Sequence, residues 1–181
     1  MTLLKWATIP IVLLSSLSAA EETPNPAKIF APSVSGESIY QDRIRLVQTF
    51  YDIMQNNDIT KLPTVLSNDY HLINASDLQE TSYSKFTEMS KNLTVRIAAL
   101  HKTFPDFQLT VTDLLVDKDQ VLAKVSISGV QKGNFLGVAP TGKPIHIKIF
   151  DIFTIKDNKI ISISEMWNEL SVMKQLGYIV L

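Results

Sequence analysis

The chain has 181 residues, of which 45% are hydrophobic and 19% charged, and its formal net charge is -1. This length suits one domain with a full core, and the near-neutral charge gives no electrostatic reason to expect nucleic acid as a partner. The chain contains no Cys, so the core alone has to stabilise it.

The first 20 residues have the pattern of a secretory signal peptide. Lys5 precedes an apolar stretch at 6–14, and the small residues Ser18 and Ala20 close the segment. The apolar stretch is shorter than the ~20 residues that a membrane-spanning helix needs. We therefore expect a bacterial protein that is exported to the periplasm or secreted, without a stable membrane anchor after cleavage. An uncleaved anchor helix is the alternative.

Residues 21–37 are rich in Pro, Ser and Glu and show no clean periodicity, so we expect a flexible linker there. One folded domain is then expected over 38–181. Apolar residues recur at helical spacing from 39 to 54, and a second, short helix is expected over 59–66.

The next part of the chain predicts one strand and one long helix. The strand is expected at 69–73. Thr81 or Ser82 then caps a helix whose apolar residues keep helical spacing as far as Leu100. The Phe-Pro-Asp sequence at 104–106 ends this helix, because the residue before a proline disfavours helical geometry.

The rest of the chain predicts strands and one last helix. Alternating apolar and polar residues predict four strands, at 107–115, 121–128, 145–155 and 160–167. The sequence GNFLGVAPTGK at 133–143 connects the second and third of them, and the last helix, Glu169–Leu176, ends at Gly177. Helices followed by a meander of strands indicate an α+β fold with an antiparallel sheet.

The turn between the last two strands decides which side chains share a face. A type I turn with a bulge puts Asn158 in the left-handed conformation and Ile155 opposite Lys159, so that odd-numbered residues of both strands share one face. A two-residue turn would split the apolar residues between both faces. A one-residue slip in register moves all the apolar side chains of a strand to the opposite face of the sheet. We favour the bulged turn, because it keeps the apolar residues of both strands on one face. The apolar face then contains Ile145, Ile147, Ile149, Phe153, Ile161, Ile163 and Trp167.

The same register puts two acids, Asp151 and Glu165, on the apolar face, as a diagonal pair roughly 6–8 Å apart. Burial raises the pKa of a carboxyl group, and two close acids can share a proton. A proton-transferring carboxyl in an apolar cavity is what enolate chemistry requires. The structural alternative is that either acid accepts hydrogen bonds from the backbone or a Tyr, or reaches solvent at the edge of the sheet.

Other catalytic patterns are missing from the sequence. The three histidines, His71, His101 and His146, do not have the spacing of metal ligands. No Ser lies in a G-x-S-x-G turn, and the glycine-rich segment lacks the pattern of a phosphate-binding loop. We therefore expect neither a metal nor a cofactor.

An ordered set of short motifs in this chain resembles the SnoaL-like family of polyketide cyclases and ester cyclases. The matching stretches are FPD at 104–106, Gly129, GNFLG at 133–137, PTGK at 140–143, DIF at 151–153, Lys159-Ile160, Glu165, Trp167 and QLG at 175–177. The resemblance spans about 44–177. It implies the cone-shaped fold of the nuclear transport factor-like, or cystatin-like, superfamily, in which helices pack into a curved antiparallel sheet around one apolar pocket.

The resemblance also implies a site. Polyketide cyclases of this family close a ring by aldol condensation, using a side-chain acid/base and no metal or cofactor. Gln131 stands where relatives often have a His, and Asn168 lies near the place where they tend to have an Asp. The candidate residues are Asp151 and Glu165 for catalysis and Gln131, Phe153, Trp167 and Asn168 for substrate binding.

Two functions are compatible with these observations. The first is an exported enzyme that performs aldol cyclase-like or isomerase-like chemistry on a small polyketide-like carbonyl compound. The second is a non-catalytic module that binds a small apolar ligand in the same cavity, or that forms a homodimer through its sheet, since uncovered sheet faces often associate.

Overall fold

The computed structural model describes residues 27–30, 37–74, 92–135, 137 and 139–179. The predicted signal peptide at 1–20 and the predicted helix start at Thr81 or Ser82 lie outside these ranges. None of the helices in the described ranges has the length and hydropathy needed to cross a lipid bilayer. Export therefore stays a prediction from the sequence.

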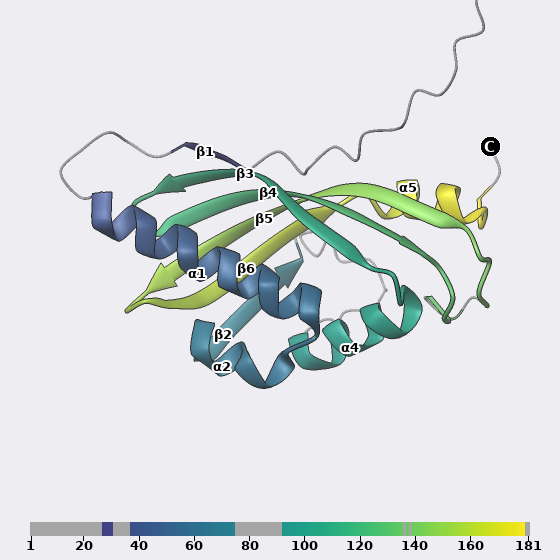
Figure 1. Ribbon diagram of the computed structural model, residues 1–181, viewed down its shortest axis with the longest axis horizontal. Helices are drawn as coiled ribbons and strands as arrows, with labels where there is room; N and C mark the ends of the chain where they lie inside the picture. Colours follow the sequence, from purple (N-terminus) through teal and green to yellow (C-terminus); the bar gives the residue numbers. More distant parts are fainter. Residues whose placement is uncertain (1–26, 31–36, 75–91, 136, 138, 180–181) are drawn as a thin grey trace, which may run out of the picture.

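The helices that precede the strand meander lie on one side of a single curved sheet, and the C-terminal helix lies at the end of the sheet (Figure 1). The helical segments are α1 (Glu37–Asn56), the 3-10 helix η1 (Ile59–Lys61), α2 (Leu62–Val65), α4 (Leu93–Thr103) and α5 (Glu169–Leu176). The strands are β1 (Lys28–Phe30), β2 (Leu66–Asn74), β3 (Gln108–Asp117), β4 (Gln120–Val130), β5 (Pro144–Lys156) and β6 (Lys159–Trp167). The predicted α+β fold, a single domain with a curved sheet, is confirmed.

The sheet is mixed rather than wholly antiparallel. Its strand order is β1-β3-β4-β5-β6-β2, and the four central strands are antiparallel, as predicted. The two edge strands, β1 and β2, pair in parallel with β3 and β6. Parallel neighbours need a crossover connection, and helices lie between the members of each parallel pair in the chain. Strand β1 falls within the predicted linker, so three residues of that segment form an edge strand.

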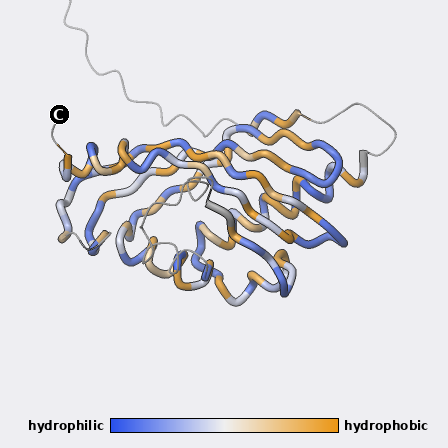
Figure 2. Tube along the Cα trace, turned by 180° about the vertical axis from the view of Figure 1, so that it is seen from behind, coloured by the Kyte–Doolittle hydropathy of each residue, from blue (hydrophilic) through white to orange (hydrophobic). Residues whose placement is uncertain are grey.

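The core lies between the concave face of the sheet and α1. On α1 the buried side chains include Val47, Tyr51 and Met54, spaced at four and three residues as one helix face requires. Along β4, buried residues alternate with more exposed ones over its whole length. Figure 2 shows the same alternation of hydropathy along the neighbouring strands. The period of two thus places one side of the sheet in the core and leaves the other outside.

Two helix boundaries differ from the prediction. Asn92 has an extended backbone, with φ -98° and ψ 97°, and its side chain accepts a hydrogen bond from the Val95 N–H. It therefore caps a new helix at Leu93, and the prediction of one helix running through this point is wrong. The expected helix at 59–66 divides into η1 and α2, and strand β2 begins directly after α2, at Leu66.

The turn between β5 and β6 also differs from the prediction. Lys156 pairs with Lys159, and both Asp157 and Asn158 have positive φ, of 50° and 55°. This is the two-residue type I′ geometry, so the predicted three-residue turn is wrong. The other predicted apolar residues nevertheless share one face, because Ile161 is an extra residue in β6, between Ile160 and Ser162. Ile160 is buried on this face in place of Ile161, so the predicted position of Ile161 there is wrong.

The glycine-rich crossing after β4 is fixed against the end of α4. The backbone N–H groups of Lys132 and Gly133 both donate to the Thr103 carbonyl oxygen, at 2.8 and 3.0 Å. A Cβ atom on Gly133 would lie 2.5 Å from the Lys102 carbonyl oxygen. Only glycine allows this approach, which explains its place in the motif.

Candidate active site

Asp151 and Glu165 lie directly opposite each other on β5 and β6. Their side chains point to the concave face, where Asp151 is 3% and Glu165 is 9% exposed. Directly opposed Cβ atoms of antiparallel strands are roughly 4.5–5.5 Å apart. The predicted burial on one face is confirmed, while the predicted diagonal offset is wrong. The two-residue turn and the extra residue Ile161 each shift the pairing of β6 with β5 by one residue.

Helix α1 brings a tyrosine to Asp151. The Tyr51 hydroxyl donates to Oδ2 of Asp151 at 2.6 Å, and Tyr51 is itself buried. A buried tyrosine hydroxyl usually finds a hydrogen-bond partner, and here the sheet provides it. The other oxygen, Oδ1 of Asp151, is buried and has no hydrogen-bond partner among the described residues.

Helix α4 brings an arginine to Glu165. Nη2 of Arg96 donates to both Oε1 and Oε2 of Glu165. The Arg96 side chain is partly buried, at 28% exposed, while that of Glu165 is 11% exposed. The two acids therefore differ in their partners: Glu165 is paired with a cation, whereas Asp151 is paired with a neutral hydroxyl.

These environments shift the pKa of two groups. Burial, and then the charge of Glu165, raise the pKa of Asp151 from 3.8 to about 7, against the opposing effects of the Tyr51 hydrogen bond and the Arg96 charge. Burial, and then the charge of Asp151, raise the pKa of Tyr51 well above 10. At neutral pH, Tyr51 thus stays protonated while Asp151 can gain or lose a proton.

Aromatic rings surround the Tyr51 end of the site. Tyr51, Phe50 and Phe153 form an edge-to-face cluster, with ring centroids 5.4 to 5.6 Å apart. Phe153 lies two residues after Asp151 and is fully buried. Trp167 is partly buried two residues after Glu165, and it pairs with Ile149 of β5. The structure therefore brings both predicted aromatic residues near the acids.

The two predicted polar residues are placed differently. Gln131 follows β4 and lies opposite Lys143. Lys143 precedes Asp151 by eight residues along the neighbouring strand, so Gln131 is roughly 26 Å from Asp151. It is fully buried, and its amide binds the crossing and the Tyr178 hydroxyl. Asn168 is exposed and caps α5, accepting from the Ser171 N–H at 2.9 Å. A substrate role for either residue stays a prediction.

The sequence analysis allowed for a Tyr that donates to one of the acids, and the Tyr51 hydroxyl does so. It did not identify which Tyr, although a tyrosine in a core predicts a buried hydrogen-bond acceptor, and it missed Arg96 altogether. The predicted acid pair could have indicated a cation such as Arg96, because a buried carboxylate is usually paired with a positive charge. Among the described residues, no three His, Asp or Glu side chains gather where they could hold a metal ion.

Comparison with known proteins agrees with this architecture. The family model for the SnoaL-like polyketide cyclases matches residues 44–176. The chain belongs to this family. The match runs from within α1 to the end of α5, and it includes Tyr51, Arg96, Asp151 and Glu165. It confirms the predicted family. No curated protein matches the chain.

Solved structures show the same fold at low sequence identity. A proposed polyketide cyclase from Bacillus cereus ATCC 10987 has a TM-score of 0.66 at 20% identity, covering 91% of this chain and 100% of its own. TsrD from Streptomyces laurentii has a TM-score of 0.63 at 24% identity, covering 77% and 97%. A proposed SnoaL-like polyketide cyclase from Jannaschia sp. CCS1 has a TM-score of 0.63 at 21% identity, covering 78% and 96%.

Proposed function

We propose that this SnoaL-like protein is an acid/base enzyme that moves a proton on a small, apolar, polyketide-like carbonyl compound without a cofactor. One observation carries the proposal. The Asp151 carboxyl is buried, accepts a hydrogen bond from Tyr51 at Oδ2, has no hydrogen-bond partner at Oδ1 among the described residues, and has a pKa of about 7. A group with a pKa near neutrality can both take and give a proton, as general acid/base catalysis requires.

The proposed chemistry begins at a carbon next to a carbonyl group. Ionised Asp151 removes a proton from this carbon, and the C–H electron pair becomes an enolate. In a ring closure, the enolate carbon attacks a second carbonyl of the same molecule, and a C–C bond forms. The oxygen of that carbonyl takes the proton from Asp151, which returns to its ionised state. In an isomerisation, Asp151 instead returns the proton to a different carbon.

The surroundings of Asp151 fit this chemistry. Tyr51 keeps its proton and holds Oδ2, so Oδ1 is the atom left to exchange a proton with a ligand. Glu165 cannot serve equally well, because Arg96 occupies both of its oxygens. The rings of Phe153 and Trp167 favour an apolar substrate, and the names of the SnoaL-like relatives support the polyketide class.

The test uses exchange of the α-hydrogens of 2-tetralone, an apolar ketone, with deuterium from solvent, followed by proton NMR. We expect the protein to accelerate exchange, with a rate that rises with pH through about 7 and then levels as Asp151 becomes ionised. Asp151→Asn should lower the protein-dependent rate by at least about 100-fold. Asp52→Asn is the matched control, because Asp52 lies next to Tyr51 in α1 but is exposed.

Each result has a defined meaning. If wild type and Asp151→Asn accelerate exchange equally, Asp151 is not the acid/base. If 2-tetralone binds to wild type and its exchange is not accelerated at any pH, the proposal of an enzyme fails and the non-catalytic ligand-binding function is favoured.

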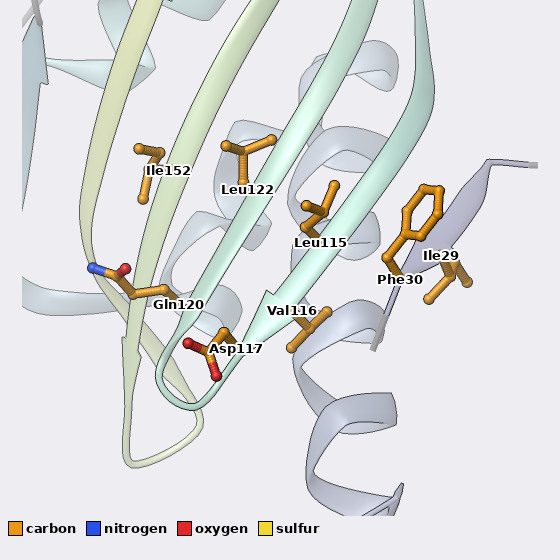
Figure 3. A pocket seen from close by; sticks show the side chains of 8 residues that line it. All are labelled: Ile29, Phe30, Leu115, Val116, Asp117, Gln120, Leu122 and Ile152. Atoms are coloured by element: carbon orange, nitrogen blue, oxygen red, sulfur yellow. The ribbon is translucent and has the colours of Figure 1, made fainter. Parts of the chain in front are cut away.

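We also propose that a second copy of this chain covers the outer face of the sheet. This face carries exposed apolar side chains on β1, β3, β5 and β6, including Phe30 at 55% and Met166 at 59% exposed. A depression of about 520 Å³ lies among them, and α1 lies behind the strands (Figure 3). It is lined by Ile29, Phe30, Leu115, Val116, Asp117, Gln120, Leu122 and Ile152.

One pair of opposite charges on this face is compensated within a single copy. A two-fold interface presents the same patch on both copies, so an uncompensated charge near the axis would lie close to a charge of the same sign. Lys124 and Asp113 lie on adjacent strands of this face and neutralise each other, with Nζ 3.3 Å from Oδ2. The exposed apolar rows on either side of this pair can then meet those of a second copy.

The expected result is a dimer in solution at micromolar concentration, measured by light scattering after size-exclusion chromatography. Leu115→Glu should convert it to a monomer, because it places a charge in the centre of the apolar face, away from the acid pair. Thr94→Glu, at an exposed position of α4, should leave the dimer intact. A monomeric wild type, or a dimer that is unaffected by Leu115→Glu, contradicts this assembly.

A further inference from the structure

The acid pair contains more negative charge than its surroundings can compensate. Two carboxyl groups face each other across β5 and β6, and the described groups in contact with them provide one cation, Arg96, and one neutral donor, Tyr51. Two ionised acids at this separation and burial repel each other strongly. One of them therefore holds a proton over a range of pH in which an exposed acid would be ionised.

The contacts distinguish the two acids. Arg96 binds both oxygens of Glu165, and a protonated Glu165 would lose one of these charge-assisted contacts. At Asp151 only Oδ2 has a hydrogen-bond partner among the described residues, so Oδ1 can hold a proton without displacing any of them. Protonation of Asp151 therefore costs less free energy than protonation of Glu165.

Groups from every element packed against the pair enter this balance. Helix α1 provides Tyr51, α4 provides Arg96, and β6 provides Glu165 itself. On the other side of Asp151, strand β4 places Ala123 opposite it, which carries no charge. On the other side of Glu165, strand β2 places Asn74 opposite it in the register, also an uncharged residue. Arg96 is thus the one positive charge that the described residues bring to the pair.

We infer that Arg96 is a positioning residue: by holding Glu165 as a permanent anion, it assigns the single mobile proton of the acid pair to Asp151. This inference rests on the proposed function, since it explains how one of two neighbouring acids becomes the group that exchanges protons. It also ties the protonation of the site to the position of α4, an element that provides no other side chain to the pair.

The inference is tested by carboxyl ¹³C NMR titration of protein labelled at Asp Cγ and Glu Cδ. In wild type we expect Asp151 to titrate near 7, and we expect this step to leave the contacts of Glu165 with Arg96 intact. In Arg96→Met the step should move up by about one pH unit or more, and the Glu165 signal should now move with it, because both acids share the proton. Arg96→Lys keeps the charge and should keep a single titrating acid.

Two further variants separate charge from structure. Arg96→Met/Glu165→Gln removes the ion pair as a whole, and Asp151 should then titrate alone again, at or below its wild-type value. Arg45→Met is the control for loss of an arginine, because Arg45 pairs with Asp42 on the exposed side of α1. If Arg96→Met does not fold, Arg96→Gln makes the same change in charge while keeping donors for Glu165.

The outcomes distinguish this inference from the proposed function. If Glu165 remains ionised and Asp151 keeps its titration in Arg96→Met, Arg96 does not position the proton, although the acid/base role of Asp151 stands. If Asp151 titrates near 4 in wild type, the proposed function loses its basis. Titration of Glu165 in Arg96→Met then still decides the role of Arg96.

Discussion

Asp151→Asn should change how the stability of this protein depends on pH, while it removes the proposed acid/base. The pKa of Asp151 is raised from 3.8 to about 7 on folding, so the folded state binds more protons than the unfolded state between these values. Wild type therefore loses stability as the pH rises through this window. At about 1.4 kcal/mol per pH unit, the loss between about pH 5 and pH 8 is on the order of 3 kcal/mol.

The measurement is urea unfolding of wild type and Asp151→Asn at several pH values in that range. The difference in free energy of unfolding should move in favour of the variant by about 3 kcal/mol from the acidic to the alkaline end. Any constant cost of placing an amide at this site shifts the whole curve and leaves its slope unchanged. Asp52→Asn is the control for loss of an exposed carboxyl group next to Tyr51. A flat difference for Asp151→Asn would show that its pKa is not raised by folding.

This dependence has a functional meaning. The ionised form of Asp151 destabilises the folded state, and an Asn at this position would make the protein more stable at alkaline pH. The protein nevertheless has an Asp there. Strain of this kind is typical of functional sites, where activity and stability compete. The same burial that makes Asp151 costly also brings its pKa to the range in which it can exchange protons.

Much of the fold could be predicted from the sequence, because local patterns determine it. The alternation in β4 and the helix end at Gly177, which has φ 77°, agree with the prediction. The parallel edge strands could not be predicted in this way, because β1 has three residues and pairs with a strand far along the chain. The register of β6 depends on two features, the two-residue turn and the extra residue Ile161. The sequence analysis predicted one bulged turn instead, and that turn gives a different pairing of β6 with β5.

The candidate site could be predicted only in part, for a related reason. Asp151 and Glu165 were identified because each interrupts an apolar face of a strand, which is a local signal. Tyr51 and Arg96 come from helices 100 and 69 residues away from their partners, and periodicity alone does not say which polar group a helix presents to which acid. Contacts across such distances follow from packing rather than from local pattern.

Gln131→Met should destabilise the protein while leaving the chemistry of the folded fraction unchanged. The Gln131 amide donates to the Gly133 carbonyl at 3.1 Å and to the Tyr178 hydroxyl at 2.6 Å. It also accepts from the Thr141 N–H and hydroxyl at 3.1 and 2.7 Å. Methionine fills a similar volume but makes none of these bonds, each of which is worth about 1 kcal/mol.

We expect a loss of about 2–4 kcal/mol in the free energy of unfolding, because the exposed Thr141 can recover part of its bonding from water. Gln108→Met, at an exposed position, should cost less than about 0.5 kcal/mol. The 2-tetralone assay then distinguishes a structural role of Gln131 from a substrate-binding role, under conditions where wild type and Gln131→Met are both folded. A rate equal to wild type supports a role in fixing the crossing, since the Asp151 site is roughly 26 Å away along the strand. A selective rise in KM with intact stability would instead support the substrate-binding role predicted from the sequence.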